Sequence, residues 1–219
     1  MREHFHEQLD QIRDQLVQMT DLVGEAMARS TRALLDADLA AAESVIASDS
    51  DIDAIADQVE SDALDLIALQ APVASELRAL VGALRMSATL ERMGDLAEHL
   101  AQIARNSYPS SAVPPELKDT IREMGELAAH LVREDGEIIS SLDVEHALRM
   151  ETEDDRMDEL QRELMATLLH DNWPHSVETA IEMAMAVRFY ERFADHSVSV
   201  ARRIVHQATG QRMERIEQN

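Results

Sequence analysis

The stretch Leu90-Glu91-Arg92-Met93-Gly94-Asp95 occurs a second time, in altered form, as Tyr190-Glu191-Arg192-Phe193-Ala194-Asp195, one hundred residues later. Each copy follows a long amphipathic run and leads into an alanine-rich stretch that is typical of a helix. A repeat of this length exceeds the roughly 20–50 residues of solenoid units. It therefore indicates a duplicated domain in which a Glu-Arg-x-x-Asp motif has been kept in both copies.

The composition favours an all-helical protein. Only 3% of the residues are aromatic, and six Gly and five Pro are few for a β-rich or α/β chain. The abundant residues, such as Ala, Leu, Glu and Met, are strong helix formers. The chain has no Cys, which excludes zinc-thiolate sites, disulfides and thiol catalysis.

The chain is strongly acidic, with 43 acidic against 20 basic residues and a formal net charge of −23. We expect no nucleic-acid partner, because phosphate affinity comes from Lys and Arg, and we expect repulsion from anionic membrane surfaces. The charge serves solubility or, alternatively, the binding of cations or of a basic protein partner. No apolar run approaches about 18 residues and no signal peptide is visible, so a cytoplasmic protein is expected.

The spacing of apolar residues predicts six long helices, three on each side of a proline-rich segment. Asp38 and Asp143 are predicted N-caps, and Pro72 and Pro174 are predicted to open the third helix of each half. The expected helices cover 3–36, 38–70, 72–106, 115–141, 143–171 and 174–207. An all-α fold of two tandem three-helix bundles follows, with a first repeat at 1–108, a linker at 109–115, a second repeat at 116–208 and a polar tail at 209–219.

Carboxylates share helix faces in both halves. Residues at i and i+4 project the same way, so the Glu and the Asp of each motif point together, in line with an apolar stripe. The second helix of each half carries its own pair, and charges on a packed face are costly unless they are paired or coordinated. Hard cations such as Mg²⁺, Mn²⁺, Ca²⁺ or ferric iron suit such oxygen ligands. The candidate metal ligands are Glu91, Asp95, Asp49 and Asp53 in the first half, and Glu191, Asp195, Asp154 and Asp158 in the second.

Other interpretations of these acids remain open. Arg85 and Arg188 lie on or near the same faces, so the carboxylates could form ion pairs instead. Glu60 could join the first set, but Met165 stands at its counterpart in the second. His99 and His196 adjoin the motifs and are more often solvated or hydrogen-bonded than ligands.

Enzyme motifs are missing from the sequence. It has no Gly-rich phosphate loop, no Gly-x-Ser-x-Gly motif and no evident basic pocket for a phosphorylated substrate. The paired Glu-x-x-His motifs of di-iron bundles are also missing. We therefore expect a protein that is not an enzyme.

With its duplicated motif and its helix order, the chain resembles the PhoU family of accessory and regulatory proteins of the bacterial phosphate-specific transport system. The resemblance spans roughly residues 3–208, and the acidic, alanine-rich second copy looks most like mycobacterial and other actinobacterial members. The residues that carry it are Val45–Asp49 with Ile52 and Asp53, Leu90–Asp95 and Tyr190–His196.

The resemblance implies metal-binding faces on the Glu-x-x-x-Asp pairs, occupied by iron or zinc in some members and metal-free in others. Mg, Mn, Fe or Zn ions are therefore the expected cofactors, if any. It also implies a regulator that couples the transporter's ATPase subunit to a membrane sensor histidine kinase and keeps the phosphate-starvation response off when phosphate is plentiful. A homodimer, held peripherally at the inner membrane face by its partners, is expected. The alternatives are a carboxylate-type metal-binding or storage bundle and a purely structural helical scaffold.

Overall fold

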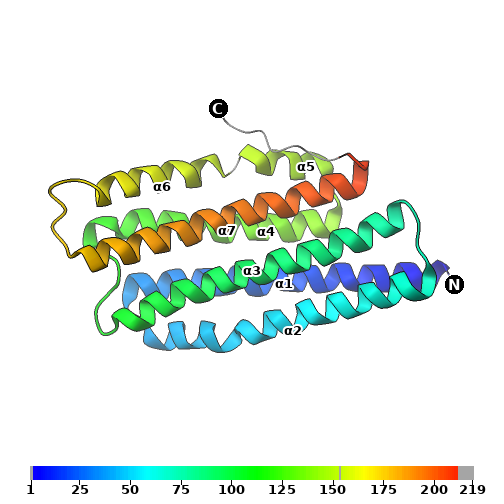
Figure 1. The fold of residues 1–219 in the computed structure, drawn as a ribbon, viewed down its shortest axis with the longest axis horizontal. Coiled ribbons are helices and arrows are strands. Elements are labelled where there is room, and N and C mark those ends of the chain that lie inside the picture. Colours follow the sequence, from blue (N-terminus) through cyan, green and yellow to red (C-terminus); the bar gives the residue numbers. More distant parts are fainter. Residues whose placement is uncertain (1, 153, 212–219) are drawn as a thin grey trace.

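The computed structural model describes residues 2–152 and 154–211, which form helices and the turns between them (Figure 1). The described part contains no strand, so the predicted all-α class is confirmed. None of its helices is both long and apolar enough to span a bilayer. The elements are α1 (Arg2–Asp36), α2 (Leu39–Gln70), α3 (Ser75–Ser107), η1 (Pro115–Leu117), α4 (Lys118–Ser141), α5 (Val144–Arg149), η2 (Met150–Thr152), α6 (Asp155–Leu168) and α7 (Val177–Thr209).

The helix starts follow local capping chemistry. The side chains of Asp38 and Asp143 accept backbone N–H groups at the starts of α2 and α5, as the sequence predicted. Pro72 and Pro174, however, precede α3 and α7 instead of occupying their first turns. Ser176 caps α7 by accepting a hydrogen bond from the next turn, so the hydroxyl and not the proline sets this boundary.

The single helix predicted over 143–171 is wrong, because the structure divides this segment into α5, η2 and α6. The sequence from Glu151 to Asp155 reads Glu-Thr-Glu-Asp-Asp, with Glu153 outside the described residues. Asp and Thr are weak helix formers, and like charges four residues apart repel. The break therefore falls where a continuous helix would be least stable, and it places Asp154 at the start of α6.

The helices of the two halves pack into one bundle. The first helices α1 and α4 contact each other, and so do the third helices α3 and α7, which lie side by side at its centre (Figure 1). The second helix α2 lies on one flank, and α5 and α6 lie on the other. One continuous apolar core draws residues from all of these helices, and Leu117 of η1 and Met150 of η2 belong to it as well. The two motif helices are thus held against each other by the main core.

A buried polar contact joins the halves. The hydroxyls of Thr31 on α1 and Tyr190 on α7 lie 2.8 Å apart, and both side chains are buried. Gly125 on α4 leaves room for this pair, because a Cβ there would lie only 2.4 Å from the Thr31 side chain. The close approach of α4 to α1 therefore requires glycine at this position.

The predicted linker is fastened to the end of α1. Ala112 and Val113 are buried, and the Ser111 hydroxyl donates to the backbone oxygen of Leu34. The Lys118 ammonium donates to the backbone oxygen of Leu35 at 2.7 Å. These donors satisfy carbonyls that the last turn of a helix leaves without partners.

One carboxyl group lies fully inside the core. Asp135 on α4 has no exposed surface, and neither of its carboxylate oxygens has a hydrogen-bond partner among the described residues. Burial raises the pKa of Asp135 well above its usual range, and the nearby Ser197 hydroxyl on α7 offsets only part of this rise. The folded protein therefore holds this group in its neutral form, which the core tolerates far better than the anion.

We predict that Asp135 makes folding less favourable as the pH rises. In the unfolded chain an aspartate loses its proton near pH 4, whereas Asp135 in the folded protein retains it. The stabilisation that is present at low pH is therefore lost as the pH rises from the pKa of the unfolded state to the pKa of the folded state. Relative to Asp135→Asn, the wild type should lose up to about 1.4 kcal/mol of unfolding free energy per pH unit in that window. Urea denaturation between about pH 4.5 and 8 measures this slope.

Asp51→Asn is the matched control, since Asp51 is exposed on α2. This variant should keep the slope of the wild type. Equal slopes for the wild type and Asp135→Asn would show that the buried carboxyl does not govern the pH dependence.

Candidate functional site

The packing of α2 on α3 gathers five carboxylates, which we call the first acidic cluster. Carboxylate oxygens of Asp49, Asp95 and Glu98 lie within 4.8 Å of one another. Asp53 and Glu91 are close enough to act on the pKa of Asp49. The structure therefore brings together all four acids that the sequence singled out in the first half, and adds Glu98.

Gly94, inside the motif, allows this approach. A Cβ at Gly94 would lie 3.0 Å from the Ile52 side chain and 3.4 Å from a carboxylate oxygen of Asp49. The α3 backbone thus passes directly beside Asp49, which draws the motif acids on the same helix toward α2. Glycine is used here for close approach and not for an unusual backbone angle.

The first acidic cluster carries strong mutual repulsion. Burial, followed by the charges of Asp53, Glu98, Asp95 and Glu91, raises the pKa of Asp49 to about 6. Burial and then Asp53 raise the pKa values of both Glu91 and Asp95. Such shifts mark a site at which a proton or a cation would be bound more tightly than by isolated carboxylates.

The second acidic cluster comprises Asp154, Asp158, Glu191 and Asp195 on α6 and α7. Burial, then the charges of Asp158, Asp155 and Asp195, raise the pKa of Asp154 to about 6. Burial raises the pKa of Glu191 as well, while Arg188 lowers it and Asp195 and Asp158 raise it. The four acids predicted for the second half are therefore also neighbours in the structure.

The second acidic cluster contains an ion pair. Arg188 donates to Glu191 at 2.6 Å, so the ion-pair alternative applies to one member of the second cluster. In the first cluster no ion pair to Glu91 is formed among the described residues, and Glu60 is exposed on α2. His99 stacks on Phe189 with ring centroids 5.1 Å apart. The first cluster is thus the less neutralised of the two.

Sequence reasoning missed Glu98, although a signal was present. Glu98 follows Asp95 by three residues and Glu91 by seven, which are spacings that share a helix face. Attention to pairs at i and i+4 alone left it out. Extending the face by one more turn would have included it.

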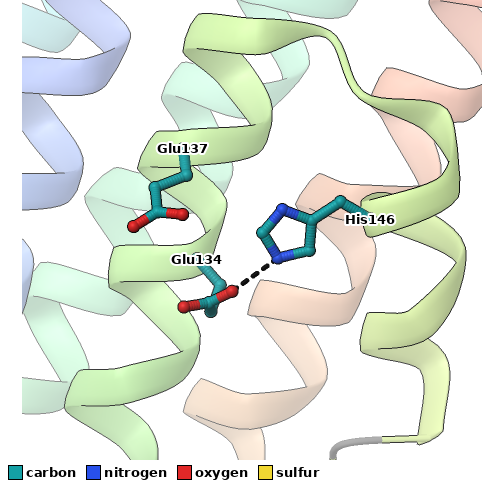
Figure 2. Close-up of side chains that lie close together, drawn as sticks. All are labelled: Glu134, Glu137 and His146. Atoms are coloured by element: carbon teal, nitrogen blue, oxygen red, sulfur yellow. Dashed lines mark hydrogen bonds and ion pairs between the residues drawn. The ribbon is translucent and has the colours of Figure 1, made fainter.

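A third group of possible ligands combines carboxylates with imidazole (Figure 2). Glu134 and Glu137 on α4 and His146 on α5 offer ligand atoms within 4.8 Å of one another. His146 Nε2 lies 2.5 Å from Glu134 Oε2, and His130 Nδ1 lies 3.6 Å from Glu134 Oε1. A mixed nitrogen and oxygen donor set suits transition metals such as zinc, manganese or iron. This group was not predicted from the sequence, because His146 comes from α5, after the turn that follows α4.

The fold and these clusters define a class of protein: an all-helical bundle of two three-helix repeats, with an acidic motif on the third helix of each. The family model of the PhoU domain matches the chain twice, over residues 16–104 and 121–204. The chain belongs to the PhoU family.

Known proteins resemble the chain over nearly its whole length. It is 46% identical to the phosphate-specific transport system accessory protein PhoU homolog 2 of Mycobacterium tuberculosis, covering 96% of this chain and 99% of that protein. It is 45% identical to PhoU homolog 1 of Mycobacterium leprae, covering 96% and 95%. The resemblance to mycobacterial members of the family is thus confirmed.

Two solved structures share the fold. The crystal structure of PhoU from Pseudomonas aeruginosa matches with a TM-score of 0.85 at 25% identity, covering 94% of this chain and 100% of that one. The structure of the phosphate transport system regulatory protein PhoU from Streptococcus pneumoniae matches with a TM-score of 0.86 at 21% identity, covering 96% and 99%.

We predict that the first acidic cluster destabilises the metal-free protein. In protein treated with EDTA, the double substitution Asp49→Asn with Asp95→Asn should raise the unfolding free energy by about 1 kcal/mol, because it removes several like-charge contacts of a few tenths each. Urea denaturation at neutral pH measures the change. Asp51→Asn, which removes an exposed acid from α2, should have little effect, and a double variant less stable than the wild type would contradict the prediction.

Proposed function

We propose that this chain is an accessory regulator of phosphate transport that acts through binding and has no catalytic activity of its own. The observation that carries the proposal is the match to both PhoU repeats, together with relatives of nearly equal length that are named phosphate-specific transport system accessory proteins. A structural neighbour is likewise named a phosphate transport system regulatory protein.

The proposed partners are the ATPase subunit of the phosphate transporter and a membrane sensor histidine kinase, with the chain itself as a homodimer. A regulator of this kind needs surfaces that bind other proteins. Val177, Ile181 and Met185 are exposed at successive turns of α7, and Leu169 is exposed just before them. Exposed apolar groups at one end of a bundle are suited to a protein interface.

We also propose that the acidic clusters bind cations in the functional state of the protein. Five carboxylates in the first cluster supply oxygen ligands that suit Mg²⁺, Mn²⁺ or ferric iron, and zinc is a further candidate for the mixed group around His146. The second cluster should bind more weakly, because Arg188 already neutralises Glu191. Cation binding would relieve the repulsion that the fold imposes on these acids.

We predict that Mn²⁺ stabilises the wild type. A ligand that binds only the folded state contributes about 2.7 kcal/mol at a hundred times its Kd. For a chain of this size that corresponds to a rise in Tm of about 5–10 °C. Thermal denaturation of EDTA-treated protein, with and without added MnCl₂, measures the shift.

Three variants assign this shift to a cluster. Asp49→Asn with Asp95→Asn should lose most of it, whereas Asp51→Asn should keep it. His146→Ala should also keep it if the first acidic cluster is responsible. An unchanged Tm of the wild type at millimolar Mn²⁺ would end the proposal that this cluster binds the ion.

In cells, the acidic motifs should be required for signalling. In a bacterial strain that lacks its own copy, the wild-type chain should silence a phosphate-starvation reporter when phosphate is abundant. A variant with Glu91, Asp95, Glu191 and Asp195 all changed to Ala should remain folded yet leave the reporter on. Reporter activity, with protein amounts checked by immunoblot, is the measurement.

The matched control removes four exposed acids outside the clusters and should silence normally; these are Glu43, Asp51, Glu126 and Asp171, each changed to Ala. A pull-down of the transporter ATPase subunit with the same variants tests the partner directly. If the wild-type chain neither silences the reporter nor retains the ATPase subunit, the regulatory proposal is wrong.

The second candidate function is a metal-storage bundle. The mixed group of Glu134, Glu137 and His146 favours it. Such a protein would bind metal but would not change the activity of the reporter.

A further inference from the structure

A groove lined by basic side chains opens between α3 and α7, although the chain as a whole is strongly acidic. Its volume is about 270 Å³, and it lies between the first turns of α3 and the last turns of α7. Arg78 and Arg85 line it from α3, and Arg203 and His206 line it from α7. None of the described residues that line it is Asp or Glu, in a chain with 43 acidic residues. The sequence showed no sign of this groove, because its basic residues come from two helices that are distant in the chain.

Among the residues that the structure describes, no acidic side chain forms an ion pair with the arginines of this basic groove. The Nε atoms of Arg78 and Arg203 are buried without a hydrogen-bond partner in the described part of the chain. Burial lowers the pKa of Arg203, and the charges of Arg85 and Arg92 lower it further. The neighbours that act on Arg203 are thus like charges. It costs free energy to hold guanidinium groups close together with buried N–H donors that have no acceptor. A bound anion would offset that cost by supplying both negative charge and acceptors.

The ring of His206 is held at the edge of the groove by a hydrogen bond to the backbone. His206 Nδ1 lies 3.1 Å from the backbone oxygen of Gln211. Because a carbonyl oxygen only accepts hydrogen bonds, Nδ1 is the donor in this contact.

The duplication supplies an internal comparison. In the register that aligns the two motifs, Arg78 corresponds to Glu178 and Gly82 to Glu182, while Arg203 corresponds to Ile103. Glu178 and Glu182 do line the related pocket at the other end of the α3–α7 pair. Both halves share the fold and the acidic motif, so the fold does not require basic residues here. The related pocket has Lys118 and His175 beside its two glutamates, whereas the groove combines three arginines and a histidine without an acid among its described lining residues.

We propose that the groove between α3 and α7 binds a small soluble anion that carries phosphoryl groups, held by Arg78, Arg85 and Arg203. Guanidinium forks match the oxygens of phosphate in geometry and charge. Three guanidinium groups exceed the charge of one phosphate, about −1.5 to −2, so two linked phosphoryl groups fit better than one. A lipid headgroup has the same chemistry, but a chain of net charge −23 is repelled by an anionic membrane, which favours a soluble ligand.

The distant negative charge does not prevent this binding. At physiological ionic strength the screening length is about 8 Å, so exposed carboxylates beyond that distance act weakly on the groove. The groove also stands apart from the acidic clusters, which use other residues of α3 and α7. The inference therefore does not rest on the proposed regulatory function or on any bound metal.

The proposal can be tested by calorimetric titration. EDTA-treated protein is titrated with pyrophosphate and, in a separate experiment, with inorganic phosphate. The chelator prevents a metal at the acidic clusters from capturing the anion. In about 150 mM KCl, the wild type should bind pyrophosphate more tightly than phosphate. Arg85→Gln with Arg203→Gln should weaken pyrophosphate binding at least about tenfold, as expected for lost charge-assisted hydrogen bonds.

Two pairs of variants make the test specific. Gly82→Glu introduces the carboxylate of the second repeat and should abolish binding, whereas Gly82→Ala should retain it, because a Cβ there meets only the flexible end of Gln207 at 3.3 Å. Arg122→Gln removes an exposed charge from α4 and should bind like the wild type. Circular dichroism melting confirms that each variant is folded.

The proposal is overturned if the wild type binds neither anion, or if the Arg85/Arg203 double variant binds as well as the wild type. Equal losses in Arg122→Gln would show that only net charge matters, which also overturns it. Sedimentation with phosphatidylserine vesicles separates the two sources of phosphoryl groups. Binding to vesicles without binding to pyrophosphate or phosphate would assign the groove to a membrane surface and overturn the soluble ligand.

Discussion

Apolar packing of α3 against its neighbours is the constraint on which the rest of the structure depends. Leu90 and Met93 have no exposed surface, and they flank acids that cannot move away without disturbing the core. Burying such side chains contributes about 1.5–3 kcal/mol each, more than the few tenths lost in each exposed like-charge contact. The hydrophobic term therefore wins, and the fold holds carboxylates together in spite of their repulsion. A site built in this way is already assembled before any cation arrives.

The two copies have diverged around this shared constraint. The first keeps glycine at Gly94, where α3 passes close to Asp49, and the second has Ala194 at the matching position. The second copy also interrupts its middle helix, which leaves Asp154 at a helix start, and it pairs Glu191 with Arg188. Of these changes the ion pair neutralises an acid directly, whereas the pKa of Asp154 is still raised to about 6, as that of Asp49 is in the first half. The two copies therefore keep their acids at matching positions, but the charged groups around those acids differ.

Features set by residues close together in the sequence were predictable, whereas contacts between residues far apart in the sequence were not. Helix ends at Asp38 and Asp143, and the shared faces of the motif acids, follow from spacings of a few residues and were predictable. The pairing of α2 with α3 followed from the duplication, because the same pattern occurred twice. His146 beside Glu134, and Arg203 beside Arg85, were not predictable, since these contacts join different helices and no periodicity within one helix relates them. The break near Glu151 was missed because helical spacing on both sides concealed a local run of weak helix formers.

The net charge of the chain did not indicate the basic groove, because net charge does not describe the charge at one place on the surface. A formal charge of −23 describes the sum over the chain, whereas the field at any one place comes from groups within about one screening length. Along α3, acids gather on the face toward α2, and arginines face α7. One helix thus presents opposite charges to its two neighbours, and the corresponding end of α7 carries Glu178 and Glu182 instead. Because α3 packs against both α2 and α7, an ion bound on either side would be held by the same rigid element. The first acidic cluster and the basic groove are therefore both built on one helix, whose apolar residues fix its position in the core.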